Sequence, residues 1–142
     1  MSESESEFEH GVTIDANGIL VVRFAGVFDV EKWADRALDP ANPANAGGFD
    51  PERPIVVDLT FFAPPPTDWP AGARRVISVI KKRGERRGRR ALVVGENIQA
   101  RIAANFFIKF KEVVAGKSEG LRIFTSFDEG YAWATEGWQR PV

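Results

Sequence analysis

At 142 residues the chain fits one domain with a buried core. Hydrophobic residues make up 44% of it, which is typical of a globular protein, and no apolar run approaches the roughly 20 residues that span a bilayer. The absence of cysteine excludes disulfides, thiolate catalysis and cysteine-ligated metal sites. The formal net charge is only -1, although acidic and basic residues are segregated along the chain.

The first residues are rich in serine and glutamate and lack the basic and apolar regions of a signal peptide, so we expect a cytoplasmic protein. Such a segment buries too little apolar surface to offset the entropy lost when it becomes ordered. We therefore predict a disordered acidic tail over residues 1–10 and a single folded domain over residues 11–142.

The domain is predicted to open with a β-hairpin. Two apolar runs, residues 12–15 and 19–24, flank the pair Asn17-Gly18. This pair readily adopts the positive φ angles that a tight hairpin turn requires.

A helix is predicted from Asp29, its N-cap residue, to about Leu38, because apolar residues recur on one face of this segment. Residues 39–54 follow and are rich in proline and glycine, which makes an unusually long loop for a compact domain. This loop is either a lid or an insertion.

Residues 54–60, PIVVDLT, are predicted to form the central strand. A continuous apolar run without polar alternation is typical of a strand that helices cover on both faces. A second helix follows the aromatic and proline-rich segment 61–66, with Trp69 as its cap residue and Pro70 as its first residue. Its predicted apolar stripe consists of Trp69, Ala73, Val76, Ile77 and Ile80.

Two more strand-helix units complete the chain. A strand over residues 91–94 precedes a helix capped by Asn97, and a strand over residues 121–124 precedes a helix that the capping box Ser126 to Glu129 opens. The third helix is predicted to turn Ile98, Ile102, Phe106, Phe110 and Val113 inward and Ile108 toward solvent or a partner. In the last helix, one face carries Tyr131, Ala134 and Trp138.

The element order is therefore β-β-α-β-α-β-α-β-α. It predicts a single α/β domain in which helices pack on a mixed sheet of about five strands, with right-handed crossovers between the later, parallel strands.

This order, with the acidic-ended strand 55–60 followed by an aromatic loop and a helix, resembles the STAS fold of anti-sigma-factor antagonists. The segment 123–133, IFTSFDEGYAW, resembles the carboxy-terminal signature of the SpoIIAA-like (STAS-like) branch. The resemblance covers roughly residues 11 to 138. It implies a noncatalytic regulatory module that binds a protein partner through the loop and helix after the central strand.

The resemblance also implies two further properties. The first is a phosphorylation site, because in the antagonist family a serine at the start of the helix after the central strand is phosphorylated. Here the family's Asp-Ser-Ser-Gly type motif is missing and the nearest hydroxyl is that of Thr67, followed by Asp68. The second is the binding of an apolar ligand, because the SpoIIAA-like branch is related to the lipid-carrying CRAL-TRIO folds.

Few residues are suited to catalysis, and we expect no enzyme and no cofactor or metal. The chain has one histidine, His10, which adjoins the predicted tail, and it lacks a nucleophile elbow or a phosphate-binding glycine loop. Asp58, Glu96 and Thr125 follow the carboxyl ends of strands, where open α/β sheets bind ligands. The simpler interpretation is that Asp58 caps a turn.

The basic run from Lys81 to Arg90 is the most conspicuous electrostatic feature. It contains no aromatic residues for base stacking, so specific nucleic-acid binding is not expected. The run is interpreted as a solvated connector that the acidic tail neutralises, and contact with an anionic membrane surface or an acidic partner remains an alternative.

Two hypotheses for function follow. The candidate binding residues are Asp58, Phe61, Phe62, Thr67, Asp68, Trp69 and Phe107, with Thr67 also a candidate phosphorylation site. One hypothesis is a noncatalytic protein-interaction module that uses residues 61–69 and the helix they precede. The other is a carrier or sensor of a small apolar or amphipathic ligand, whose site is lined by Phe61, Phe62, Trp69, Phe106 and Phe107. A cavity behind Phe62 and Trp69 favours the carrier, and a filled core favours the interaction module.

Overall fold

A computed structural model describes residues 7–45, 50–66, 69–116 and 120–139. Thr67 and Asp68 therefore lie outside the described residues, and so does part of the predicted loop over residues 39–54. In the described part of that loop, Pro43–Asn45 form a short 3-10 helix, η1.

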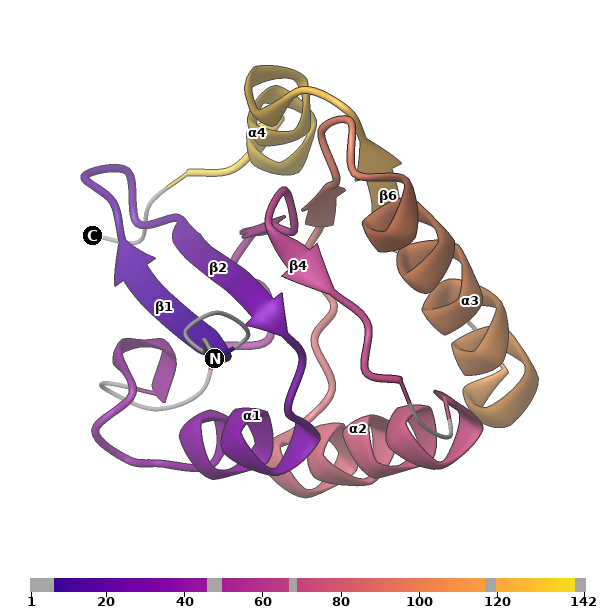
Figure 1. Ribbon diagram of the computed structural model, residues 1–142. Coiled ribbons are helices and arrows are strands. Elements are labelled where there is room, and N and C mark those ends of the chain that lie inside the picture. The colour runs from indigo at the N-terminus through magenta and orange to yellow at the C-terminus, as the bar shows by residue number, and fades with distance from the viewer. Residues whose placement is uncertain (1–6, 46–49, 67–68, 117–119, 140–142) are drawn as a thin grey trace.

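The sheet has the predicted mixed architecture (Figure 1). Its main path runs in the order β1 (Glu9–Ile14), β2 (Leu20–Val27), β3 (Ile55–Asp58), β5 (Arg90–Val93) and β6 (Leu121–Phe124). Only β1 and β2 are antiparallel, and the other neighbours along this path are parallel. The predicted central strand is confirmed, because β3 lies between β2 and β5.

The two-residue strand β4 (Phe62–Ala63) was not predicted. It pairs with Gly26 and Val27, at the end of β2 that extends beyond its pairing with β3. Two residues are too few to show a strand pattern in sequence, and the pairing exists because that part of β2 has no other neighbour on this side.

The hairpin forms as predicted, with Gly18 at a φ of 79°. The folded domain begins earlier than predicted, because β1 includes Glu9 and His10 and the preceding Phe8 is buried. The predicted boundary at residue 10 thus lies inside a strand. Phe8 lies in one buried cluster with Trp33 of the first helix, and its ring meets that of Phe28 edge-on, which provides the apolar contact that a purely acidic tail would lack.

In the described part of the chain, four α-helices cover the two faces of the sheet. They are α1 (Val30–Ala37), α2 (Trp69–Arg83), α3 (Ile98–Ala115) and α4 (Phe127–Thr135). In Figure 1, α4 lies at the top, α1 and α2 lie at the bottom, and α3 lies at the right. Among the described helices, none is both long and apolar enough to cross a membrane.

The face under α4 has a filled core of Ile19, Val56, Ala91, Val93 and Ala134. Gly130 lets α4 approach the sheet closely, because a Cβ at this position would lie only 3.1 Å from Cγ2 of Val93. The capping residue Ser126 accepts a hydrogen bond from the Glu129 N–H, as predicted. Trp138 lies beyond the end of the helix at Thr135 but packs against the same core.

The predicted orientation of α3 is correct at Phe106, which is half-buried with its ring against Trp69 of α2, and wrong at three other positions. Ile98, Ile102 and Val113, expected to face inward, are 73%, 54% and 83% exposed. The buried face instead carries Ala100 and Ala104, and Ile108 packs with them against the sheet.

The capping residue Asn97 explains this rotation. Its Nδ2 donates hydrogen bonds to the carbonyl oxygens of Thr60 (2.9 Å) and Phe62 (2.8 Å), while its Oδ1 accepts one from the Ala100 N–H (3.0 Å). The start of α3 is therefore tied to the segment after β3. Because apolar residues occur on both faces of α3, periodicity alone could not select the buried face.

Candidate functional site

The second face of the sheet is hollow where it meets the helices. A cavity of about 1010 Å³ lies between this face and α1, α2 and α3. Its floor is formed by apolar side chains at alternate strand positions, among them Leu20, Val22, Ile55, Val57 and Leu92. The alternation places Val56 on the other face, in the filled core beneath α4. The two faces of one sheet thus differ in packing.

Aromatic side chains line the end of the cavity where the parallel strands finish. Phe62, Trp69, Phe106 and Phe107 contribute to the wall there. The Trp69 ring meets Phe106 edge-on at 5.6 Å between centroids, and its Nε1 donates a hydrogen bond to the Pro65 carbonyl oxygen at 3.2 Å. The indole N–H is therefore satisfied, so the ring is held in place as an apolar surface.

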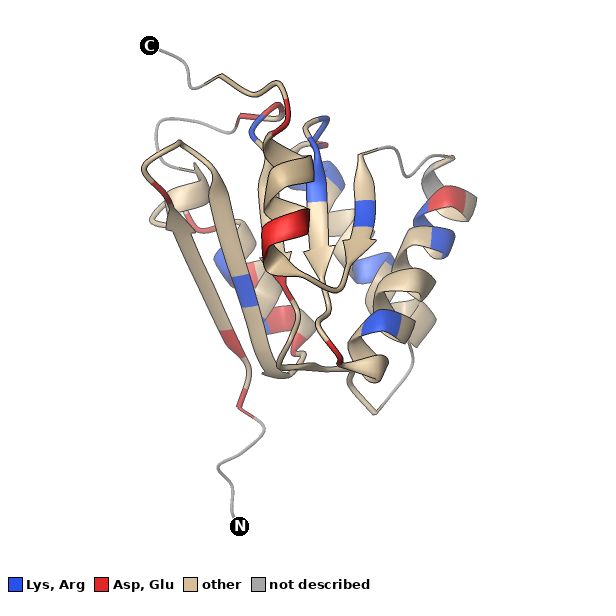
Figure 2. Cartoon of the chain, turned by 90° about the horizontal axis from the view of Figure 1, so that it is seen from above, with Lys and Arg blue, Asp and Glu red and all other residues tan. Residues whose placement is uncertain are grey.

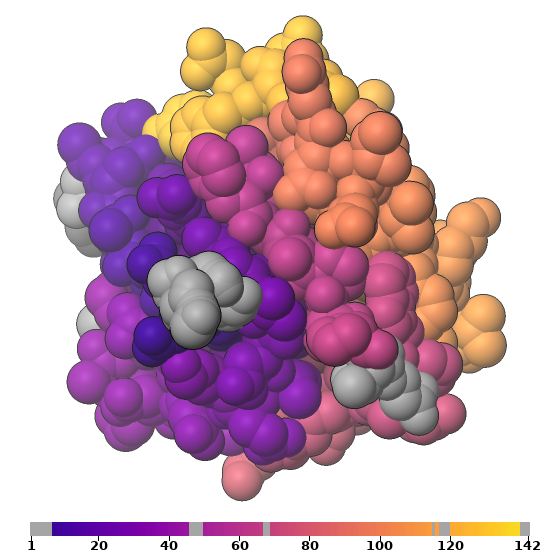
Figure 3. Space-filling model, viewed as in Figure 1, coloured from indigo at the N-terminus to yellow at the C-terminus, as the bar shows by residue number. Residues whose placement is uncertain are grey.

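Prolines 64–66 also line this end. In the space-filling view, the segment that contains β4 and these prolines lies on the surface between the N-terminal part of the chain and α3 (Figure 3). Pro66 is exposed, so this part of the wall separates the cavity from solvent.

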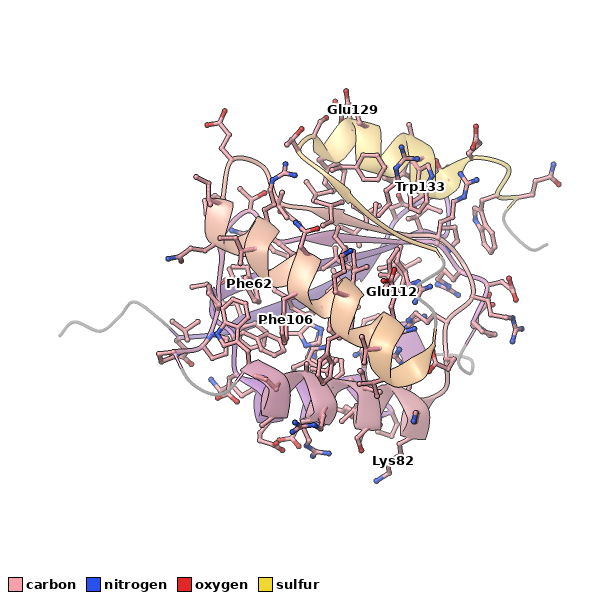
Figure 4. All side chains as sticks on the ribbon, turned by 90° about the vertical axis from the view of Figure 1, so that its right-hand side faces the viewer. Phe62, Lys82, Phe106, Glu112, Glu129 and Trp133 are labelled. Carbon is pink, nitrogen blue, oxygen red and sulfur yellow. The ribbon has the colours of Figure 1, made fainter. Side chains whose placement is uncertain are left out.

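Basic side chains line the opposite end, where the parallel strands begin. They are Arg83 at the end of α2, Arg86 in the connector after it, Arg90 at the start of β5 and Lys111 on α3. Arg86 and Lys111 are only 9% and 3% exposed. In Figure 4, Phe62 and Phe106 of the aromatic end lie near the N-terminal half of α3, and the labels Glu112 and Lys82, which are not lining residues, mark the C-terminal ends of α3 and α2.

The prediction that the basic run is a solvated connector is therefore wrong for its arginines 83, 86 and 90. The connector is held against the segment before β3, because the N–H groups of Arg87 and Gly88 both donate to the Pro51 carbonyl oxygen (2.7 and 2.9 Å). A Cβ at Gly88 would collide with the Glu52 carbonyl oxygen, so only glycine permits this approach. Lys81, Lys82 and Arg87 do face solvent. Lys and Arg residues are spread over several strands and helices (Figure 2).

Burial affects the protonation equilibria of these cations. Burial, together with the charges of Arg83, Arg90 and Arg53, lowers the pKa of Arg86 to about 9, against the opposing effect of Asp50. Burial lowers the pKa of Arg83 to about 10, although Glu85 opposes this shift. Glu85 also forms an ion pair with Lys111, with its Oε1 3.6 Å from the lysine Nζ. At these pKa values Arg83 and Arg86 remain charged at neutral pH.

His10 lines the cavity from β1 and does not belong to a tail. Its ring meets Phe24 edge-on at 4.8 Å, and its buried Nδ1 makes no hydrogen bond to any part of the chain that the structure describes. Burial and, secondarily, the charge of Arg36 lower the pKa of His10 to about 4. The imidazole is therefore neutral at neutral pH.

The structure brings together three of the predicted binding residues. Phe62, Trp69 and Phe107 all line the cavity. Phe61 does not, since its ring is 62% exposed and the Arg23 guanidinium lies over it at 5.1 Å. Thr67 and Asp68 are outside the described residues.

Asp58 has the turn role that was the simpler interpretation. Its Oδ1 accepts the N–H of Thr60 at 2.9 Å, and it is not among the lining residues. The other two polar residues at this edge, Glu96 and Thr125, are exposed. Within the ranges described, no group of three or more His, Asp or Glu side chains is arranged to hold a metal ion.

Sequence reasoning missed the basic end of the cavity. A signal for it exists in Lys111, because this residue lies on the same helical face as Ala104 and Ile108 once Asn97 sets the rotation of α3. The arginines offered no such signal, since a run of charges normally faces water.

Comparisons with known proteins bear on the fold. No family model and no curated protein sequence matches this chain. A crystal structure of an uncharacterized protein of the DUF3478 family from Shewanella loihica PV-4, described as having a SpoIIAA-like fold, is similar with a TM-score of 0.61 over 94% of this chain and 98% of that one. The chain has the SpoIIAA-like fold. Sequence identity is 16%, so the likeness extends to the fold alone.

The resemblance predicted from sequence is confirmed at this level. In this SpoIIAA-like fold, the cavity lies on the face covered by α1, α2 and α3, and the loop and helix after the central strand form part of its wall through Phe62 and Trp69.

Proposed function

We propose that this SpoIIAA-like domain is a noncatalytic carrier or sensor that binds a small apolar or amphipathic molecule in the cavity. The observation that carries the proposal is the cavity of about 1010 Å³ behind Phe62 and Trp69. Its volume is at the upper end of the range of roughly 300–1,000 Å³ found for small-molecule sites, and its lining is mainly apolar with a few polar groups, as in such sites.

The apolar surface that the walls present supports this proposal. Several lining residues, among them Glu7, Asp29 and Pro66, are exposed, so the cavity opens to solvent. Apolar walls hold water poorly, so the water in the cavity is readily displaced. An apolar molecule would recover the contacts that the walls lack.

The chemistry of the lining is suited to binding rather than reaction. Phe62, Trp69 and Phe107 offer shape and apolar area, and the indole N–H of Trp69 is already satisfied by Pro65. His10 is neutral, and its ring lies beside the apolar rings of Phe8 and Phe24. We assign no catalytic step to these residues.

A variant that fills the cavity tests the proposal. Gly72 lies on α2 in the lining, and a Cβ there would meet nothing within 4 Å, so Gly72→Leu would place a side chain in the cavity without a backbone clash. We expect at least a tenfold loss of affinity for N-phenyl-1-naphthylamine, a neutral apolar probe whose fluorescence increases in apolar surroundings.

The matched control is Ser78→Leu, which adds the same side chain to an exposed position of α2 outside the cavity. This control should bind the probe as the wild type does. Failure of the wild type to bind, or equal binding by both leucine variants, would refute the proposal.

A second candidate is the protein-interaction module, with a partner bound through residues 61–69 and α2. The exposed ring of Phe61, next to the cavity wall but outside it, favours this candidate. Native mass spectrometry of the protein purified from its own host separates the two. A co-purified apolar molecule supports the carrier, and a stoichiometric protein that is lost with Phe61→Ala supports the interaction module.

A further inference from the structure

We infer that the ligand of the cavity is amphipathic and carries an anionic group, a carboxylate or a phosphate, which is bound by Arg83, Arg86, Arg90 and Lys111 while the apolar part extends toward Phe62 and Trp69. This inference rests on the proposed function and specifies the chemical class of the ligand. It follows from the placement of the two kinds of lining residue at opposite ends of one cavity.

The length of α2 shows how far apart these ends are. Trp69 is the first residue of α2 and Arg83 is the last, fourteen positions later, and both line the cavity. At 1.5 Å per residue this separation is about 21 Å along the helix axis. The cavity therefore extends along the whole of α2, with an aromatic end and a basic end, which leaves room for a chain-like molecule with one charged terminus.

The four basic residues come from four different segments. The end of α2, the connector, the start of β5 and the second half of α3 each contribute one of them. Surface lysines and arginines normally extend into water, but here Lys111 is 3% exposed and Arg86 is 9% exposed. The fold thus places these cations together between the sheet and the helices, at the end of the cavity opposite the aromatic residues.

The carboxylates of the lining do not oppose an anion at the basic end. They are Glu7, Asp29 and Glu31, which lie near α1 and are exposed. Each has a described partner: Glu7 pairs with Lys32 at 3.5 Å, Glu31 pairs with Arg75 at 3.0 Å, and Asp29 accepts the N–H groups at the start of α1.

Carboxylates outside the lining also act on the basic end, among them Glu85 and Asp50. Glu85 pairs with Lys111, and Asp50 acts on Arg86. Mutual repulsion nevertheless persists, since Arg83, Arg90 and Arg53 all disfavour the charged form of Arg86. An anion at this end would oppose that repulsion, and guanidinium groups match carboxylate and phosphate oxygens in two-pronged hydrogen bonds.

The experiment compares three probes that share one alkyl chain and differ only in the head group. Laurate carries a carboxylate, dodecyl phosphate carries a phosphate and dodecanol is neutral. Isothermal titration calorimetry at neutral pH measures each dissociation constant with the full chain. We expect laurate, dodecyl phosphate or both to bind at least ten times more tightly than dodecanol, and the better of the two identifies the head group.

Two variants locate the head group. Lys111→Gln and Arg86→Gln each should weaken binding of the preferred anionic probe about tenfold and leave dodecanol binding unchanged. Lys82→Gln is the matched control, because Lys82 is an exposed cation of the same basic run outside the cavity. Circular dichroism of each variant checks that it is folded, and having two variants keeps the test valid if one of them does not fold.

The outcomes separate this inference from the proposed function. If dodecanol binds as tightly as both anionic probes, or if neither glutamine variant that folds affects the anionic probe selectively, the anion site is refuted and the apolar carrier stands. If none of the three probes binds, the proposed function fails together with the inference.

Discussion

At the scale of single residues, His10 makes the stability of the domain depend on pH. The unfolded chain has an ordinary histidine with a pKa of 6.5, whereas burial lowers the pKa of His10 in the folded domain to about 4. Between these values the unfolded state binds a proton that the folded state does not. The contribution to stability is therefore complete above pH 6.5 and is lost as the pH falls toward 4.

We expect this loss to be about 3 kcal/mol, because one pKa unit corresponds to about 1.4 kcal/mol. Urea unfolding at several pH values between 7 and 4 measures it, with His10→Phe as the comparison, since phenylalanine suits a position beside Phe8 and Phe24. Stability curves of the wild type and the variant that run parallel over this range would contradict the prediction.

At the scale of elements, Asn97 determines how α3 sits on the sheet. It caps the helix through Ala100 and holds the carbonyl groups of Thr60 and Phe62. A cap contributes about 1 kcal/mol and each of the two hydrogen bonds about 1 kcal/mol, so Asn97→Ala should lower the free energy of unfolding by about 2–3 kcal/mol.

Asn105→Ala is the control for this substitution. Asn105 lies on the exposed side of α3, and its side chain donates to the Arg101 carbonyl oxygen within the same helix. Its loss should cost less than about 0.5 kcal/mol. Equal effects of the two substitutions in urea unfolding would show that Asn97 does not anchor α3.

At the scale of the whole molecule, the domain has one filled core and one hollow core. The side under α4 is packed, whereas the side under α1, α2 and α3 encloses the cavity. A ligand that binds only the folded state should therefore stabilise the domain as a unit. At a free concentration of 100 times the dissociation constant it adds about 2.7 kcal/mol.

For a domain of this size that increment corresponds to a rise in Tm of about 10 °C. We expect laurate to produce this shift in the wild type and a much smaller one in Gly72→Leu, where the cavity is partly filled. Differential scanning calorimetry measures both. The same shift in both proteins would place the binding site outside the cavity.

The local features of this protein could be read from its sequence because they depend on neighbours along the chain. The Asn17-Gly18 turn and the N-caps Asp29 and Ser126 each involve interactions within a few positions. The strand over residues 55–58 pairs with distant strands, but the continuous apolar run that predicts it is a local pattern. The order of these elements was sufficient to predict the SpoIIAA-like fold.

The rotation of α3, the burial of the basic residues and the cavity were decided only by tertiary structure. Asn97 selects the buried face of α3 through carbonyl groups more than thirty positions away in the chain. Pro51 and Gly88 hold the basic connector against another loop. The size of a cavity depends on the distances between elements, and no periodicity within one element encodes those distances. Phe62 and Trp69 could therefore be proposed as ligand contacts from sequence, whereas Arg86 and Lys111 could not.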